Sequence, residues 1–159
     1  MAEQLGKVDH SSLRANQAFI IILLLVGFVL NVPWLVALVA VVMLIGTAVG
    51  RPGFSFIYKG VLRPLGIVTP HVLADNPEPH RFAQGFGGVV SAVSAGLLFL
   101  GAVTGGWVLT WLVIVLAALN LFAGFCAGCA VYYWLNRLQV PGFARTPPPG
   151  TFPGMRPRA

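Results

Sequence analysis

Charge is what this sequence has least of: charged residues make up 9% of its 159 positions, and hydrophobic residues make up 57%. An ordinary soluble domain is roughly a quarter charged, so this composition excludes a soluble enzyme. Cysteine occurs only twice, in Cys126-Ala127-Gly128-Cys129. Chemistry that needs a thiol is therefore confined to one place in the chain.

Four long stretches contain no Asp, Glu, Lys or Arg: residues 15–30, 32–49, 82–103 and 107–133. A single helix over the first two would be about 50 Å long, whereas the hydrocarbon core of a bilayer is about 30 Å thick. A tight hairpin at Asn31-Val32-Pro33 must therefore separate them. The first stretch is not predicted to be a cleaved signal peptide, because no small-x-small site follows it and a second apolar stretch comes at once.

The predicted fold is an all-α membrane protein, a bundle of four transmembrane helices at about residues 15–30, 33–49, 82–103 and 107–133. Residues 1–14 are predicted to be a cytoplasmic N-terminal segment, and residues 15–135 the membrane domain. Apolar side chains at helical spacing over about residues 54–65 predict an amphipathic helix in the cytoplasmic interface, broken near Pro64. Residues 136–159 are rich in Pro and poor in apolar side chains, which predicts a disordered cytoplasmic tail.

Basic residues set the predicted orientation. With four spans, all ten Lys and Arg fall on one side of the membrane, in the N-terminal segment, the central segment and the tail. The positive-inside rule makes this side cytoplasmic, so we expect a multi-pass membrane protein with both termini in the cytoplasm. The basic residues are scattered and flank apolar spans, which favours contact with the anionic headgroups of the lipid bilayer over nucleic-acid binding.

Helix length places the cysteines near the cytoplasmic end of the fourth predicted span. Counted from Trp107, Cys126 and Cys129 lie about 28 and 33 Å along a regular helix, and residues three apart can form a disulfide. The C-terminal end of a helix in apolar surroundings disfavours a thiolate, so activation must come from elsewhere. His80 and Arg81 enter the third predicted span from the same side. A nearby cation favours a thiolate, and His can move a proton.

The cysteine pair admits three interpretations: redox or sulfur chemistry, inert small apolar residues, and metal binding. Two thiolates make half of a zinc site, and His10, His71 and His80 would have to supply the rest. The spacing does not support this, so no metal ligand is predicted. For Arg81, the alternative is a residue that merely marks the membrane edge.

Three sequence blocks are specific in combination: Val8-Asp9-His10-Ser11-Ser12-Leu13-Arg14-Ala15-Asn16-Gln17, Pro79-His80-Arg81-Phe82-Ala83-Gln84-Gly85 and Gly124-Phe125-Cys126-Ala127-Gly128-Cys129. Together they resemble a family of small bacterial four-span membrane proteins that carries a domain-of-unknown-function label, over roughly residues 8–135. Members of that family are similar in layout to DoxX-like membrane proteins and occur beside or fused to thioredoxin-like or sulfurtransferase domains. The resemblance implies a thiol or sulfur relay at a bacterial inner membrane, with a thioredoxin-like or sulfurtransferase protein as a separate partner chain.

Two hypotheses follow. In the first, Cys126 and Cys129 are catalytic and cycle between dithiol and disulfide or carry a persulfide, with Cys126 as the attacking thiol and His80 and Arg81 tuning it. No resident cofactor is predicted, although a quinone or persulfide sulfur would suit such chemistry. In the second, the protein is a non-catalytic accessory subunit that stabilises a larger membrane complex. A transporter is disfavoured because no charged or broken-helix site lies at the midplane.

Overall fold

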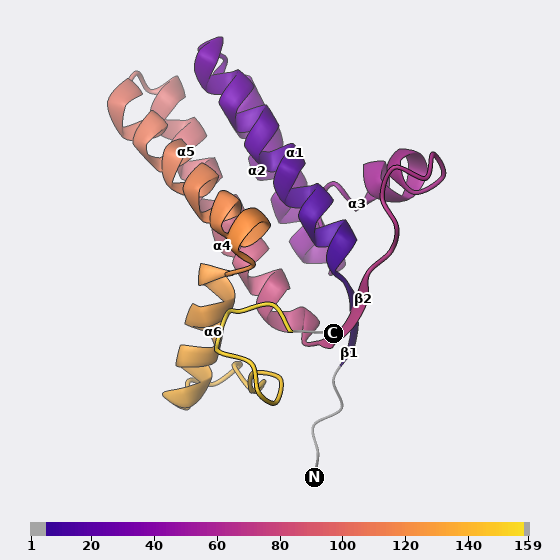
Figure 1. The fold of residues 1–159 in the computed structure, drawn as a ribbon. Helices are drawn as coiled ribbons and strands as arrows, with labels where there is room; N and C mark the ends of the chain where they lie inside the picture. The colour runs from indigo at the N-terminus through magenta and orange to yellow at the C-terminus, as the bar shows by residue number, and fades with distance from the viewer. Residues whose placement is uncertain (1–5, 158–159) are drawn as a thin grey trace.

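The computed structural model describes residues 6–157 and is mostly helical (Figure 1). Three stretches of helix are long and apolar enough to cross a membrane: α1 (His10–Val29), α4 (Pro77–Phe99), and α5 (Val103–Ala118) with the π-helical turn η2 (Leu119–Ala123) that continues it. Between 28% and 33% of each apolar window is buried inside the chain. The remaining apolar surface faces outward, which suits a lipid bilayer.

A fourth apolar helix, α2 (Pro33–Val49), is shorter, with 17 residues. The chain turns before it as the sequence indicates. Asn31 has a φ of 51°, and Pro33 occupies the first helical position, where its missing N–H needs no partner. α2 packs against α4, where Gly88 lies close to the side chains of Met43 and Leu44. The helical bundle is thus present, while a fourth membrane span stays a prediction.

α4 begins at Pro77, earlier than the predicted start at residue 82. Proline suits the first turn of a helix, and Glu78 in that turn complements the helix dipole. The polar residues before the apolar stretch are therefore helical. As a consequence, His80 lies in the first turn of α4 rather than in a loop.

The last predicted span, residues 107–133, is not one helix, and that prediction was wrong. α5 and η2 end at Gly124, whose φ of 66° is a left-handed conformation that glycine adopts at little cost. A separate helix, α6 (Ala127–Arg137), begins after Cys126 and extends below the bundle in Figure 1. Hydropathy alone cannot separate one continuous apolar helix from two that meet at a turn.

A small antiparallel sheet, which the sequence did not predict, lies at the same end of the molecule as α6 (Figure 1). Strand β1 (Gly6–Asp9) pairs with β2 (Val72–Asp75), and Gly6 is opposite Asp75. β1 leads directly into α1, whose first turn Asp9 caps by accepting hydrogen bonds from the backbone N–H groups of Ser11 and Ser12. Because β2 leads into α4, the sheet brings the starts of α1 and α4 together.

The predicted interfacial helix over residues 54–65 is shorter in the structure. It consists of α3 (Ser55–Ile57) and the π-helical turn η1 (Tyr58–Leu62). Buried Tyr58 ties this segment to the start of α1 by donating a hydrogen bond from Oη to Oδ2 of Asp9, at 2.9 Å.

The predicted disorder of the tail is not confirmed, because residues 138–157 fold back against the helices. Arg145 forms a salt bridge of 2.8 Å with Glu78 at the start of α4. Further along, Met155 pairs with Phe125 in an isolated β-bridge. The second contact places Met155 beside the start of α6.

Candidate functional site

The cysteines lie at the N-terminus of α6, not near the end of a long span. Cys126 is the N-cap residue, and its Sγ accepts a hydrogen bond from the backbone N–H of Cys129 at 3.2 Å. A disulfide joins the two residues, whose Cα atoms are 5.2 Å apart. A helix N-terminus stabilises a thiolate. The helix dipole therefore favours a thiolate at this position, whereas the sequence indicated that it would disfavour one.

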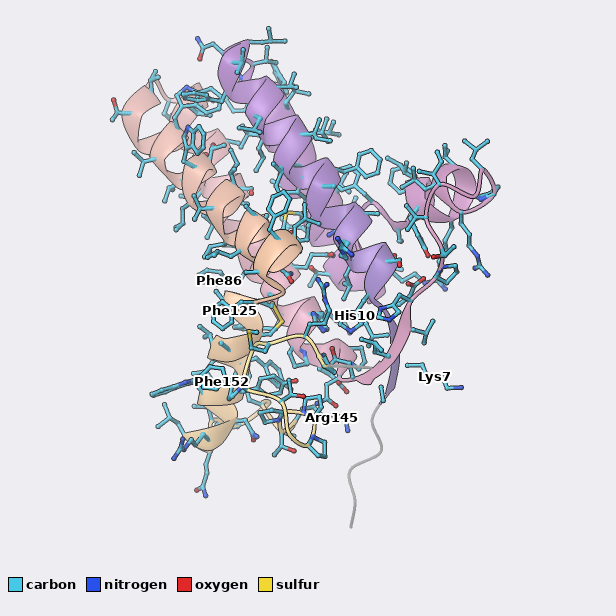
Figure 2. All side chains as sticks on the ribbon, in the orientation of Figure 1. Lys7, His10, Phe86, Phe125, Arg145 and Phe152 are labelled. Atoms are coloured by element: carbon cyan, nitrogen blue, oxygen red, sulfur yellow. A yellow bond between two sulfur atoms is a disulfide. The ribbon has the colours of Figure 1, made fainter. Side chains whose placement is uncertain are left out.

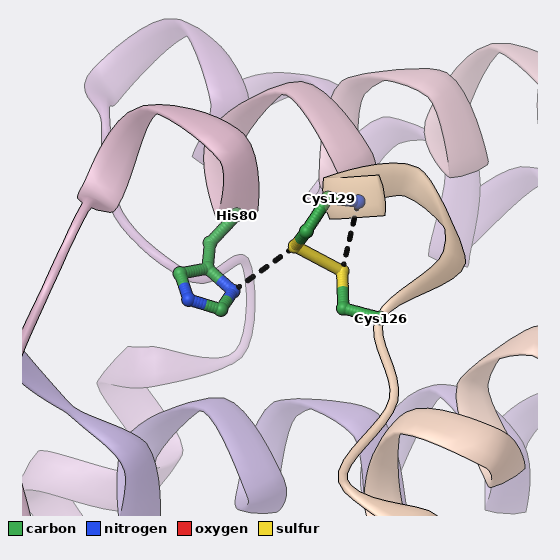
Figure 3. Close-up of side chains that lie close together, drawn as sticks. All are labelled: His80, Cys126 and Cys129. Atoms are coloured by element: carbon green, nitrogen blue, oxygen red, sulfur yellow. Dashed lines mark hydrogen bonds between the residues drawn. A yellow bond between two sulfur atoms is a disulfide. The ribbon is translucent and has the colours of Figure 1, made fainter. Parts of the chain in front are cut away.

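His80 is the predicted site residue that the structure brings to the cysteines. Figure 3 shows its ring facing the disulfide from α4, with Nδ1 at 3.4 Å from Sγ of Cys129. The other ring nitrogen, Nε2, lies 2.9 Å from Oδ2 of Asp75. When Nε2 carries the ring proton and donates a hydrogen bond to this carboxylate, the lone pair of Nδ1 faces the sulfur.

Asp75 ends β2 and is the residue that sequence reasoning missed. It is 3% exposed, it accepts a hydrogen bond from the backbone N–H of Asn76, and its Oδ2 lies 3.1 Å from Nε2 of His10. Burial alone would raise the pKa of this carboxyl group. The contacts with His10, His80 and Asn76 outweigh burial and hold the pKa well below its usual range, so Asp75 is a buried carboxylate.

The order Asp75, His80, Cys129 therefore forms a chain of contacts from a carboxylate through an imidazole to sulfur. The carboxylate orients the ring and fixes its tautomer, as in hydrolytic triads, where a base is oriented by a third group. The sequence signal that could have revealed Asp75 is its position five residues before His80, among only four acidic residues in the chain. Without the β1–β2 pairing, however, nothing distinguishes it from a loop residue.

Arg81 does not face the cysteines. Its guanidinium donates hydrogen bonds to the backbone carbonyls of Thr47 and Ala48, at 2.6 and 3.3 Å. These carbonyls belong to the last turn of α2, where a cation complements the helix dipole. The position fits a role in joining α4 to α2 better than a role in tuning sulfur.

The end of the tail covers the site. Gly154, Met155 and Arg156 form what we call the strap. The carbonyl of Gly154 accepts a hydrogen bond from the N–H of Cys126 at 2.7 Å, and the N–H of Arg156 donates to the carbonyl of Gly124 at 2.9 Å. Cys126 and Cys129 are consequently 6% and 3% exposed. A large partner reaches the sulfur atoms only when the strap moves.

The same cluster brings together metal ligands whose spacing in the sequence did not support a site. Ligand atoms of His80, Cys126 and Cys129 lie within 4.8 Å of one another, and so do those of His10, Asp75 and His80. The cysteines could ligate a metal only after the disulfide is reduced. Three ligands are one fewer than a closed structural zinc site requires.

Comparison with known proteins identifies the family. The chain belongs to the family described as Domain of unknown function (DUF4395), whose model matches residues 8–137. The predicted membership in a small family of unknown function is therefore confirmed. The matched region includes the helical bundle and every residue of the Asp75, His80, Cys126 and Cys129 cluster. No curated protein and no solved structure matches the chain significantly.

Proposed function

We propose that this DUF4395 protein is a membrane thiol–disulfide oxidoreductase whose Cys126–Cys129 pair cycles between dithiol and disulfide. One observation supports this most strongly: Cys129 Sγ lies 3.4 Å from Nδ1 of a histidine whose Nε2 is held at 2.9 Å by a buried carboxylate. A disulfide with a purely structural role does not require an oriented base. Proton transfer to and from sulfur does need one.

The chemistry balances as thiol–disulfide exchange with a dithiol donor. A donor thiolate attacks Sγ of Cys126, the Cys126–Cys129 bond breaks, and Cys129 leaves as a thiolate next to His80. The donor's second thiol then attacks the mixed disulfide, and Cys126 leaves as a thiolate stabilised by the start of α6. The donor becomes a disulfide, and two electrons and two protons pass to the pair. The reverse reaction follows the same steps, with Nδ1 of His80 accepting the proton of Cys129.

The side of the membrane and the partner belong to the same proposal. The site lies at the end of the bundle that also carries β1 and the tail (Figure 1). In the sequence, basic residues flank the spans at this end. By the positive-inside rule this end is cytoplasmic, in a bacterial inner membrane. A soluble thioredoxin-like or sulfurtransferase protein is the proposed partner on that side.

Thiol trapping tests the proposal. Purified protein is alkylated before and after treatment with a reductant, and its mass is measured. A cycling pair gives a mass shift of two alkyl groups only after reduction, and reoxidation removes it. Cys126→Ser is the control, since it leaves one thiol that cannot re-form the intramolecular bond. Equal labelling before and after reduction would rule the proposal out.

The same preparation tests the second hypothesis, the accessory subunit. If the pair does not cycle, and the protein copurifies from its native membrane with stoichiometric larger subunits whether or not Cys126→Ser is present, the non-catalytic role is favoured.

A further inference from the structure

We infer that the oxidant of the cysteine pair is a lipid-soluble quinone that enters from the bilayer through a cavity between α1, α4 and α5. This inference rests on the proposed function and names the second substrate of the same site.

The cavity has a volume of about 80 Å³ and reaches from the helices to Cys126. Its walls are mostly apolar, with Ile20 from α1, Val90 from α4 and Val113 from α5. Cys126 lines it and Cys129 does not, so the cavity reaches the disulfide at Cys126. The strap residues Gly154, Met155 and Arg156 do not line this cavity.

The cavity opens toward the lipid side of the bundle. Phe86 of α4, labelled in Figure 2, and Leu112 of α5 both line it, yet they are 55% and 45% exposed. Exposed apolar side chains on spanning helices face the bilayer. A ligand dissolved in lipid can therefore reach Cys126 without displacing the strap, whereas a protein cannot.

Polar groups in the cavity fit a ligand with carbonyl oxygens. The side-chain amides of Gln17 and Asn120 line it. Within residues 6–157 neither amide forms a hydrogen bond to another group of the chain, although the backbone carbonyl of Asn120 accepts one from Arg156. Unpaired amides are costly beside lipid and mark functional positions in membrane proteins. Each can donate an N–H to a quinone carbonyl, and His80, which also lines the cavity, can transfer a proton.

The redox step balances with the quinone as the electron acceptor. The two thiols lose their S–H bonds and form the Cys126–Cys129 disulfide. Two electrons and two protons pass to the quinone, whose carbonyl oxygens become the hydroxyl groups of a hydroquinone. The neutral product returns to the lipid through the opening by which the quinone entered. Electrons thereby pass from a dithiol donor to the membrane quinone pool.

The test uses the full chain, reduced and reconstituted without oxygen in lipid vesicles that contain decylubiquinone. The ring of this quinone has no unsubstituted carbon, which suppresses direct addition of thiols to the ring. Quinone reduction is followed by absorbance and disulfide formation by alkylation. We expect one quinone to be consumed per disulfide formed. Wild-type protein that exchanges with a glutathione redox buffer but does not reduce decylubiquinone overturns this inference and leaves the proposed function standing; if neither reaction occurs, both fail.

Variants locate the reaction. Ala117→Leu enlarges a side chain that lines the cavity, and Ala118→Leu makes the same change at a neighbouring position that does not. We expect the first to slow quinone reduction and the second to leave it unchanged. Gln17→Leu, which keeps the cavity volume closer to native, should raise the KM for quinone by about threefold to tenfold, the effect of one lost hydrogen bond. Equal rates in Ala117→Leu, Gln17→Leu and wild type would show that the quinone reacts elsewhere.

Discussion

At the scale of single residues, the distinctive feature is a histidine held between a buried carboxylate and a disulfide. Cys126 and Cys129 alone would be a generic redox signature. His80 adds a group that can move a proton, and Asp75 fixes which ring nitrogen does so. Substitutions in this cluster should therefore affect the rate of thiol exchange and the stability of the fold differently.

Removing the imidazole should slow thiol exchange. In His80→Gln we expect the exchange rate with a small dithiol to fall about a hundredfold, the usual contribution of a positioned acid–base group. His71→Gln is the matched control, because exposed His71 lies outside the cluster. The measurement is the rate of alkylatable thiol formation over a range of pH. A purely structural histidine would alter thermal stability without changing the pH profile of the rate.

Asp75 makes a prediction about pH and stability. Its folded pKa lies below the unfolded value of about 4, so the ionised group stabilises the fold above that pH. This contribution is lost as the pH falls through the folded pKa. Asp75→Asn should therefore lower the melting temperature at pH 7 and flatten its decline under acid.

Glu78→Gln provides the comparison for Asp75→Asn. It removes a carboxylate near the same helix start whose salt bridge is partly exposed, and it should change the melting temperature at pH 7 less. Identical melting curves for wild type and Asp75→Asn at neutral and acidic pH would contradict the role assigned to Asp75.

At the scale of elements, α6 sets the position of the cysteines relative to His80, and the strap limits access to them. α6 is seated on α4 at Gly128, where an added Cβ would approach Cβ of Ala83 to 2.6 Å. This close approach brings Cys129 to His80. The geometry of the site therefore depends on the packing of α6 against α4.

Adding a methyl group at that contact tests the seating. Gly128→Ala should cost about 1–3 kcal/mol of unfolding free energy through overpacking and slow thiol exchange. Gly96→Ala is matched, because Gly96 is also helical but has nothing within 4 Å of the added Cβ; it should be neutral or slightly stabilising. Denaturation curves and exchange rates measure both effects. Equal unfolding free energies and equal exchange rates in the two variants would show that the site does not depend on this helix contact.

The strap should limit access to the disulfide. Gly154→Ala adds a Cβ within 2.8 Å of the Cys126 carbonyl oxygen, so we expect the strap to lift and a water-soluble phosphine to reduce the disulfide several-fold faster. Gly150→Ala controls for backbone strain: its φ of 73° is as left-handed as the 87° of Gly154, but its added Cβ meets nothing within 4 Å. Unchanged reduction rates in both variants would show that the strap does not gate access.

At the scale of the whole molecule, the sequence predicts the helical membrane architecture, and it predicts the cysteines and the histidine of the candidate site. Hydropathy identifies the apolar helices, and sequence inspection singles out Cys126, Cys129 and His80. It does not identify Asp75, because that residue reaches His80 only through a strand pairing between segments far apart in the chain. The turn at Gly124 is equally hidden, since one glycine in an apolar stretch is ordinary in membrane helices.

The long-range contacts change the chemistry inferred for the pair. A continuous fourth span would leave the cysteines near the C-terminal end of a helix, where the dipole disfavours a thiolate, with no base fixed beside them. The break at Gly124 places Cys126 at a helix N-terminus, and the small sheet supplies the carboxylate. Local sequence patterns therefore single out the candidate residues, while their proposed activation depends on tertiary structure.

A redox titration of the full chain in lipid nanodiscs tests the central claim most directly. The protein is equilibrated in buffers of graded potential, made from reduced and oxidised dithiothreitol and from reduced and oxidised glutathione, then alkylated and analysed by mass spectrometry. We predict a single reversible transition, in which the unlabelled and doubly labelled forms interconvert with a two-electron dependence on potential. A pair that stays oxidised or stays reduced across the whole range, or that changes irreversibly, would contradict the account.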